Sequence, residues 1–324
     1  MSAGVPALSG AAPAMAISLV LGSGGARGYA HIGAIEELEA QGFAIRSIAG
    51  SSMGALIGGV YAAGKLPAYR EFVRPLQRLD VLRLLDWTFS GGGFIKGDRI
   101  LGVLRDLIGE IDIEALPIPY TAVAVDLDAQ REVWFSRGPL FDAIRASIAI
   151  PTVFRPHHLH GRLLVDGGLL NPLPVSPTLR DLTDATVAVD VNAPAEPLPA
   201  PAPRDRGTAG QASPELIGGE PDSSPARHAG YRRRIAGFFA AGRAHGTPAP
   251  HDPGAFELFA RSLDVVQETI TRLKLAAQPP DLLITIPRNA CAVYDFHRAE
   301  ELIELGRRRT REALARWTPL RKPG

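Results

Sequence analysis

The sequence predicts an α/β fold with three layers, in which helices cover both faces of a mainly parallel central sheet. Short apolar runs that stop at glycine alternate with helical stretches near the start of the chain, and the same alternation returns near its end. Such alternation is typical of parallel sheets covered by helices. Of the 324 residues, 46% are hydrophobic and 21% are charged, so a large buried core is expected.

Two strand–loop–helix units open the chain. Residues 17–21 are a short apolar run that stops at glycine, which is typical of a buried strand. Residues 45–49 are expected to form a second strand, which runs into Gly50. Apolar residues at helical spacing predict helices over 28–42 and 53–63. Right-handed crossovers place the loops after both strands at the same edge of the sheet. We therefore expect these two loops to carry the functional site.

The remaining elements follow the same signals. The expected strands are 120–126, 132–136, 163–165, 186–190 and 281–286, and the expected helices are 98–109, 139–147, 256–275 and about 296–317. Pro139 is expected at the first helical position of its helix. The last strand–helix pair is expected to complete the same sheet.

The composition changes sharply after residue 192. Residues 193–254 are rich in Pro, Ala, Gly and Ser, and such a stretch buries too little apolar surface to offset its ordering entropy. We predict a single catalytic domain formed by residues 16–192 and 255–318. It is interrupted by a mostly disordered insertion at 193–254 and preceded by a flexible N-terminus, residues 1–15.

Charge and cysteine usage exclude several classes of protein. Lys plus Arg is 35 and Asp plus Glu is 34, so the basic excess typical of nucleic-acid binding is missing. The single cysteine, Cys291, cannot form an internal disulfide, and no zinc-type spacing occurs. The start of the chain lacks the basic residues of a secretory signal, and no apolar run reaches the roughly 20 residues of a membrane span. We expect a soluble cytoplasmic protein, with the inner membrane face as an alternative place of action.

A serine stands between two glycines in the pattern G-x-S-x-G, formed by Gly50, Ser52 and Gly54. On a sharp strand-to-helix turn, this pattern lifts the serine Oγ above the sheet and places it at a helix N-terminus, which favours developing negative charge. A five-residue pattern of this kind also occurs by chance in unrelated sequences. The prediction of a nucleophile therefore depends on the expected strand before Ser52 and the expected helix after it. The simpler alternative is that Ser52 only caps that helix.

A glycine-rich loop, residues 22–28, separates the first strand from the first helix. Loops of this kind turn backbone N–H groups toward a common point, which suits either a phosphate or the oxyanion of an acyl-transfer intermediate. A dinucleotide site requires glycine at the sixth place and an acidic residue about 20 residues later. Arg27 occupies the sixth place and residues 45–50 contain no carboxylate, which argues against a dinucleotide.

Asp166 follows the expected strand 163–165 and precedes Gly167 and Gly168. At a strand's C-terminal end it is placed to face the same sheet edge as Ser52. In isolation, a turn aspartate that caps its own backbone is the stronger interpretation.

Taken together, the segments 24–28, 50–54 and 166–168 resemble the patatin-like phospholipases. The resemblance extends to residues 92–98, 146–156 and 171–174, covers about 17–190 with a weaker similarity near 294–306, and is strongest to small stand-alone bacterial members.

This resemblance implies a Ser-Asp dyad without a catalytic histidine. Ser52 attacks the ester carbonyl, Asp166 accepts its proton, and the N–H groups of Gly24, Gly25 and Met53 form the oxyanion hole. The supporting motif residues are Gly22, Arg27, Gly28, Gly50, Gly54, Gly167 and Gly168. Neither a cofactor nor a metal is expected, and the mechanism gives calcium no role. One departure is Ser23, where plant-type members carry another glycine.

Histidines and basic residues offer alternatives to this assignment. An α/β-hydrolase would use Ser, Asp and His in chain order, and His297 is the one credible relay for such a triad. His31 is expected to pack or to hydrogen-bond locally. His157, His158 and His160 form a cluster, for which a surface loop is favoured over a metal site. Arg27 either contacts an anionic head group or pairs with a helix carboxylate.

The predicted function is hydrolysis of carboxylic esters of phospholipids or lysophospholipids, of the phospholipase A or lysophospholipase type. One alternative keeps Ser52 but makes the chain an acyltransferase or thioesterase. A second alternative is a non-catalytic lipid-binding regulator. Residues 231–239 mix basic and aromatic side chains, which suits either a solvated charge run or contact with an anionic membrane surface. No nucleic-acid partner is expected, and the sequence leaves the oligomeric state open.

Overall fold

The structure is a computed structural model that describes residues 14–84, 98–151, 154–197 and 255–318. Its elements belong to one compact unit, formed by residues up to 196 and from 259 onward, apart from the first four residues of the helix that starts at Ala255. The stretch 231–239 and most of the predicted insertion lie outside the described residues.

The strands are β1 (Ala16–Leu21), β2 (Ala44–Ser51), β3 (Tyr120–Asp126), β4 (Arg131–Phe135), β5 (His157–Leu159), β6 (Arg162–Asp166), β7 (Ala185–Ala193) and β8 (Leu282–Pro287). The α-helices are α1 (Ala30–Ala40), α2 (Met53–Ala62), α3 (Leu66–Val73), α4 (Arg78–Leu84), α5 (Asp98–Ile108), α6 (Leu140–Ser147), α8 (Ala255–Ala277) and α9 (Ala299–Arg316). Short 3₁₀ turns include η1 (Gly25–Tyr29), η3 (Gly167–Leu169) and η6 (Phe296–Arg298).

Within the described part of the chain, the strands form one eight-stranded sheet with the path β5-β6-β3-β2-β1-β7-β8, and β4 pairs with β3. The neighbours β3-β2, β2-β1, β1-β7 and β7-β8 are all parallel. Strands buried on both faces read as nearly continuous apolar runs, and every residue of β1 after Ala16 is buried. The sheet is therefore mainly parallel, as the sequence predicts.

Two strands share one edge of β3. β4 pairs with one edge of the C-terminal part of β3, so β2 and β6 lie on the other edge, β2 beside its first half and β6 beside its second. β2 runs parallel to β3 and β6 antiparallel, and their C-terminal ends therefore meet head to head. In this register Ser51 lies beside Val123, and Asp166 lies beside the next residue, Ala124.

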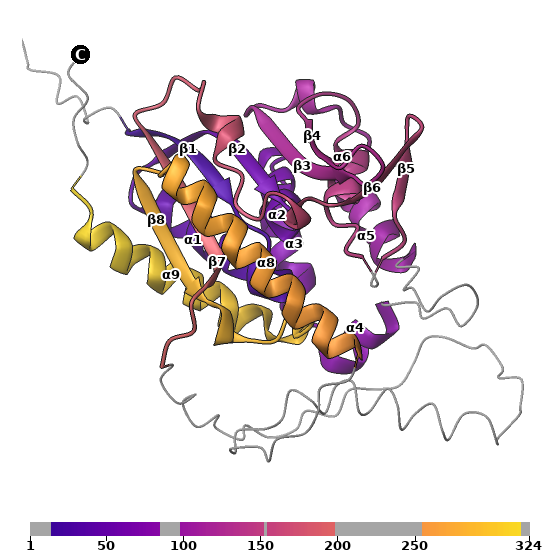
Figure 1. The fold of residues 1–324 in the computed structure, drawn as a ribbon. Helices are drawn as coiled ribbons and strands as arrows, with labels where there is room; N and C mark the ends of the chain where they lie inside the picture. The colour runs from indigo at the N-terminus through magenta and orange to yellow at the C-terminus, as the bar shows by residue number, and fades with distance from the viewer. Residues whose placement is uncertain (1–13, 85–97, 152–153, 198–254, 319–324) are drawn as a thin grey trace, which may run out of the picture. The chain divides into compact units, whose positions relative to one another are not determined.

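Helices cover both faces of the sheet. Successive side chains of a strand point to opposite faces. Leu275 of α8 packs on the face that presents Val20, while Gly58 of α2 lies against Leu21 and Ile48 on the other face. In Figure 1, α8 (orange) crosses in front of the sheet and α1 and α2 lie behind it. This is the expected three-layer arrangement.

Helices α1 and α9 cross at very close range. A Cβ on Gly306 would lie 2.0 Å from the carbonyl oxygen of Ala30, and a Cβ on Gly33 would lie 1.8 Å from that of Ile303. Charged groups at this contact add ion pairs, such as the one between Arg311 and the buried carboxylate of Glu37. The C-terminal helix is thus fixed against the helix that follows the glycine-rich loop.

Most predicted elements are confirmed to within a few residues, and the last strand–helix pair does complete the sheet. Three details differ. Pro139 is the N-cap of α6 and precedes its first helical residue. Residues 157–159 form strand β5, where the sequence favours a loop, because they pair with β6. Helices α3 and α4 are additional to the predicted elements. Within the described ranges, no helix combines the length and the apolar character needed to cross a membrane.

Candidate active site

Ser52 occupies the sharp turn between β2 and α2. Its backbone has φ 55° and ψ −124°, a conformation that residues other than glycine rarely adopt. The two glycines of the motif make this turn feasible, since a Cβ on Gly50 would lie 2.5 Å from the backbone of Gly54. A Cβ on Gly54 would in turn lie 2.1 Å from the carbonyl oxygen of Leu21. Close backbone packing thus holds Ser52 at the end of the sheet.

A second serine holds the backbone of Ser52. The N–H of Ser52 donates to Ser147 Oγ at 2.9 Å, and that hydroxyl donates to the carbonyl oxygen of Val123 at 2.5 Å. Ser147 ends α6 and is fully buried. Its hydroxyl therefore bridges β3 to the turn at the point where β2 leaves the sheet.

Asp166 receives the side chain of Ser52 directly. Ser52 Oγ donates to Asp166 Oδ2 at 2.5 Å, and the N–H of Gly168 donates to Oδ1 at 2.7 Å. The carboxyl group is buried, with the residue 5% exposed. Burial raises the pKa of Asp166 to about 7, and the hydrogen bonds from Ser52 and Gly168 oppose that rise. The meeting of β2 and β6 end to end is what brings the two side chains together.

Some backbone N–H groups of the glycine-rich loop donate hydrogen bonds, and others have no acceptor within the described residues. On either side of its bend, Gly22, Ser23 and Ala26 donate to the carbonyl oxygens of Val189, Pro172 and Val293. Among the described residues, the N–H groups of Gly24, Gly25 and Met53 have no acceptor. Gly25 has φ +55°, and a Cβ there would lie 2.5 Å from Val293, so this bend requires glycine. Free donors beside a nucleophile are what an oxyanion requires.

Two buried side chains anchor this loop. Arg27 Nε donates to the carbonyl oxygen of Gly24 at 3.2 Å, and its Nη1 donates to that of Arg288 at 3.0 Å. His31 lies 2.8 Å from the carbonyl oxygen of Gly22 through Nε2, which must therefore carry the proton. Burial lowers the pKa of His31 to about 4, so the ring is neutral at pH 7. The expectation that His31 makes a local hydrogen bond is confirmed.

The supporting glycines pack at the same sheet edge. A Cβ on Gly28 would lie 2.5 Å from that of Met53, and a Cβ on Gly167 would lie 2.0 Å from the carbonyl oxygen of Val123. Gly168 abuts the side chain of Ser23, whose buried Oγ has no partner among the described residues. The glycine-rich loop, the G-x-S-x-G turn and the segment 166–168 therefore converge on one place.

Two cavities meet at Ser52. One is apolar and reaches from Ser52 toward α3, α4 and α5; its lining includes Leu56, Tyr69, Leu104, Ile148, Phe154 and Phe296. The other is more polar and reaches from Ser52 and Asp166 toward α8; its lining includes Arg27, Asp264, Gln267 and Tyr294.

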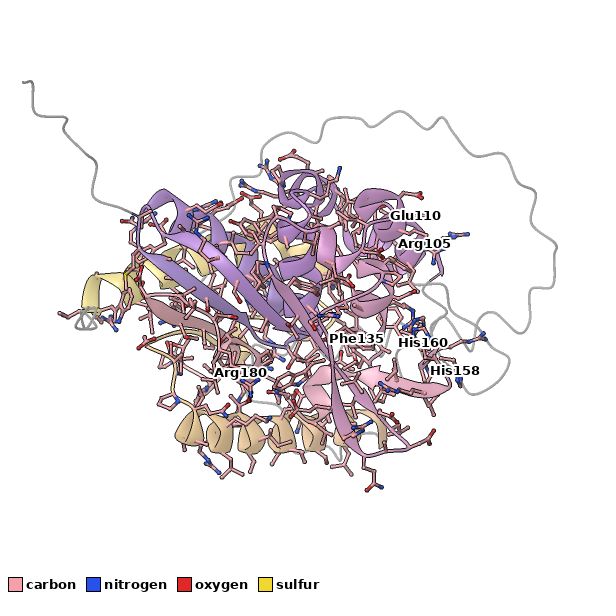
Figure 2. All side chains as sticks on the ribbon, turned by 90° about the horizontal axis from the view of Figure 1, so that it is seen from above. Arg105, Glu110, Phe135, His158, His160 and Arg180 are labelled. Carbon is pink, nitrogen blue, oxygen red and sulfur yellow. The ribbon has the colours of Figure 1, made fainter. Side chains whose placement is uncertain are left out.

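The other histidines of the described ranges lie outside this constellation. His297 Nε2 accepts a hydrogen bond from Arg78 Nε at 3.1 Å, and it does not line either cavity. His158 and His160 are exposed at the β5–β6 hairpin, where Figure 2 labels both. His157 Nε2 lies 3.7 Å from Asp142 Oδ1, an acidic neighbour that the sequence does not indicate.

Several residues at the site carry no role that the sequence assigns. Ser147 belongs to the segment 146–156 that carries the resemblance, but its bond to Ser52 joins residues 95 positions apart. Asp264 and Gln267 come from α8, and Tyr294 follows β8. The amphipathic spacing of residues 256–275 predicts the helix but not the sheet edge that it reaches.

Comparisons with known proteins find relatives that are similar to this chain over most of its length. A family model described as patatin-like phospholipase matches residues 19–179. Uncharacterized NTE family proteins of Mycobacterium bovis and Mycobacterium tuberculosis are each 43% identical over 330 residues, which cover 92% of this chain and 91% of theirs. Neuropathy target esterase sws of Drosophila melanogaster is 32% identical over 183 residues, or 54% of this chain and 13% of its own. The crystal structure of VipD from Legionella pneumophila superposes with a TM-score of 0.47 at 14% identity, covering 91% of this chain and 68% of that one.

Proposed function

The chain belongs to the patatin-like phospholipase family, and on this premise we propose that it is a serine lipid acyl hydrolase that cleaves carboxylic esters of phospholipids or lysophospholipids. Ser52 is the nucleophile, Asp166 is the base, and the N–H groups of Gly24, Gly25 and Met53 bind the oxyanion. The observation that carries the proposal is the direct hydrogen bond from Ser52 Oγ to the buried carboxyl of Asp166, with no imidazole between them.

The reaction proceeds in two halves. Asp166 Oδ2 takes the Ser52 proton as Oγ bonds to the ester carbonyl carbon, and the resulting oxyanion is stabilised by the free N–H groups. Collapse breaks the bond to the alcohol, which leaves with the proton from Asp166, and the acyl group remains on Ser52. Asp166 then deprotonates a water molecule that attacks the acyl-serine. Collapse of this second intermediate breaks the bond between Oγ and the acyl carbon, Ser52 Oγ takes the proton back from Asp166, and the carboxylic acid leaves.

The apolar cavity supports a lipid substrate. Its lining is aliphatic or aromatic beyond Ser52 and the glycine-rich loop, and it opens directly at the nucleophile. An acyl chain placed there would replace water against apolar side chains, which is favourable by about 25 cal/mol for each Å² buried. An ester with a long apolar acyl chain therefore fits this site better than a polar ester.

The test is an ester-hydrolysis assay with EDTA present, on a short-chain p-nitrophenyl ester and on phospholipids and lysophospholipids. Wild type should release fatty acid, while Ser52→Ala and Asp166→Asn should each lose at least about 10³-fold in kcat/KM. The control variants Ser136→Ala and Asp128→Asn change exposed residues of the same types, and their activity should match wild type.

Other results would point to the alternatives. An active Asp166→Asn variant together with an inactive His297→Ala variant would replace the dyad with a triad. No labelling of Ser52 by a fluorophosphonate would support a non-catalytic lipid-binding role. Transfer of the acyl group to an added lipid or thiol acceptor would identify an acyltransferase.

A further inference from the structure

The hydrogen bonds of the sheet do not by themselves join Ser52 to Asp166. The ladder between β2 and β3 ends at Ser51, beside Val123, and the ladder between β6 and β3 ends at Asp166, beside Ala124. Ser52 lies one residue past its ladder, on a turn with φ 55°. Such a sparsely populated conformation persists only where the surrounding structure holds it. Contacts outside the sheet must therefore fix the nucleophile relative to its base.

One short segment binds the backbone of both reacting residues. It consists of residues 147–149, at the end of α6, and we call it the bridging segment. Ser147 Oγ accepts the N–H of Ser52 at 2.9 Å, and the carbonyl oxygen of Ala149 accepts the N–H of Asp166 at 3.0 Å. The nucleophile and its base are thus held by two acceptors that lie two residues apart at the same helix end.

The hydroxyl of Ser147 is used on both sides. A hydroxyl has one hydrogen to donate, and that of Ser147 goes to the carbonyl oxygen of Val123 at 2.5 Å, so the hydroxyl is an acceptor toward Ser52. Ser147 and Ser52 are both buried, and bulk water is therefore not a ready replacement. Without this hydroxyl, the N–H of Ser52 would have no acceptor among the described residues, which is costly for a buried backbone group. The strained turn would then relax and carry Oγ away from Asp166.

Ser147 is able to affect the reaction without touching the ester. It lines neither the apolar nor the polar cavity, whereas the next residue, Ile148, lines the apolar one. A change at Ser147 therefore leaves the surfaces that bind the two halves of the ester in place. Its effect falls on the distance between Ser52 Oγ and Asp166, and so on the step in which the proton moves.

We propose that Ser147 is a positioning residue, whose hydroxyl holds the backbone of Ser52 so that Oγ stays within hydrogen-bonding distance of Asp166. This inference rests on the proposed function, in which Asp166 takes the proton from Ser52. The bridging segment fixes where the nucleophile lies, and the carboxyl group of Asp166 supplies the base. A misplacement of about 1 Å costs roughly 10²-fold in rate, which sets the size of the expected effect.

The test measures kcat and KM with a short-chain p-nitrophenyl ester, together with the rate at which a fluorophosphonate labels Ser52. Ser147→Ala should lower kcat and the labelling rate by roughly 10–100-fold and leave KM within about twofold of wild type. Ser147→Thr retains the hydroxyl and should recover most of the lost kcat. Ser147→Cys keeps the size of the side chain but has only a weakly hydrogen-bonding S–H, and it should lower the same two rates by less than Ser147→Ala.

The matched control is Ser18→Ala, because Ser18 is another fully buried serine, whose hydroxyl hydrogen-bonds to that of Thr183 near the start of β1. Both alanine variants lose a buried hydrogen bond and should melt at a lower temperature than wild type, but Ser18→Ala should keep the wild-type kcat, KM and labelling rate.

Three results would overturn the positioning role while leaving the proposed hydrolysis intact. They are unchanged rates in Ser147→Ala, an equal loss of kcat in Ser18→Ala, and a rise in KM at unchanged kcat. If wild type itself neither hydrolyses any ester nor is labelled at Ser52, the proposed function fails and this inference fails with it.

Discussion

At the scale of single residues, Asp166 is buried where its ionised form is least favoured, which raises the pKa of its carboxyl group to about 7. A proposed base works only when it is ionised. We therefore predict that kcat/KM rises with pH through about 7 and levels off above it. A pH profile with a short-chain p-nitrophenyl ester measures this directly, and a rate that is flat from pH 5 to 9 would contradict the role of Asp166.

The same pKa shift predicts that stability changes with pH in the opposite direction to activity. The unfolded carboxyl has a pKa of about 3.9, so between roughly pH 4 and pH 7 the folded state holds a proton that the unfolded state has lost. The free energy of unfolding therefore falls as pH rises through that window. Asp166→Asn removes this penalty, which is roughly 4 kcal/mol at most.

Thermal unfolding of the two proteins at several pH values is the measurement. At pH 8 the Asp166→Asn variant should melt at a higher temperature than wild type, and near pH 4 the two should converge. If the variant is less stable than wild type at pH 8, the hydrogen bonds that the Asp166 carboxylate accepts from Ser52 and Gly168 stabilise the fold by more than the burial of its charge destabilises it.

At the scale of elements, the contact between α1 and α9 leaves no room for a side chain. We predict that Gly306→Ala destabilises the protein by at least about 1–3 kcal/mol, since its Cβ would overlap the carbonyl oxygen of Ala30 and force the helices apart. Chemical denaturation measures the change. The control is Gly102→Ala in α5, where a Cβ meets nothing within 4 Å and should stabilise by about 0.5–1 kcal/mol.

Most element types and the mainly parallel sheet were predictable from local patterns, whereas the order of the strands was not, and the geometry of the site was only partly so. Ser52 and Asp166 were predictable at one sheet edge because each lies just after a stretch that the sequence predicts as a strand. The meeting of β2 and β6 end to end on β3 depends on pairing between distant segments, which no local pattern records. The same holds for the bond between Ser147 and Ser52, and for the approach of Asp264 from α8.

At the scale of the whole molecule, we predict that the segment 198–254 is dispensable for catalysis. Replacing it with a Gly/Ser linker of about 20 residues should leave hydrolysis of a p-nitrophenyl ester unchanged, because the length of a connecting loop affects stability only weakly. Extending the deletion through residue 277 should instead impair folding. It removes Leu275 from the core and the ion pair between Lys274 and Glu132.

Activity and unfolding curves of both deletion variants check this prediction. Loss of ester hydrolysis in the shorter deletion, with cooperative unfolding retained, would assign the segment a part in catalysis and refute the single-domain organisation proposed for residues 16–192 and 255–318.

The end-to-end meeting of β2 and β6 also limits how this site is able to evolve. Inserting or deleting one residue in β2, β3 or β6 would turn alternate side chains to the opposite face and separate Ser52 from Asp166. Length changes in these strands are thus closed to natural variation and to protein engineers alike. New substrate ranges are expected to arise in the walls of the two cavities, on α3 to α5 and on α8, where a substitution leaves the register of the strands that hold the reacting pair unchanged.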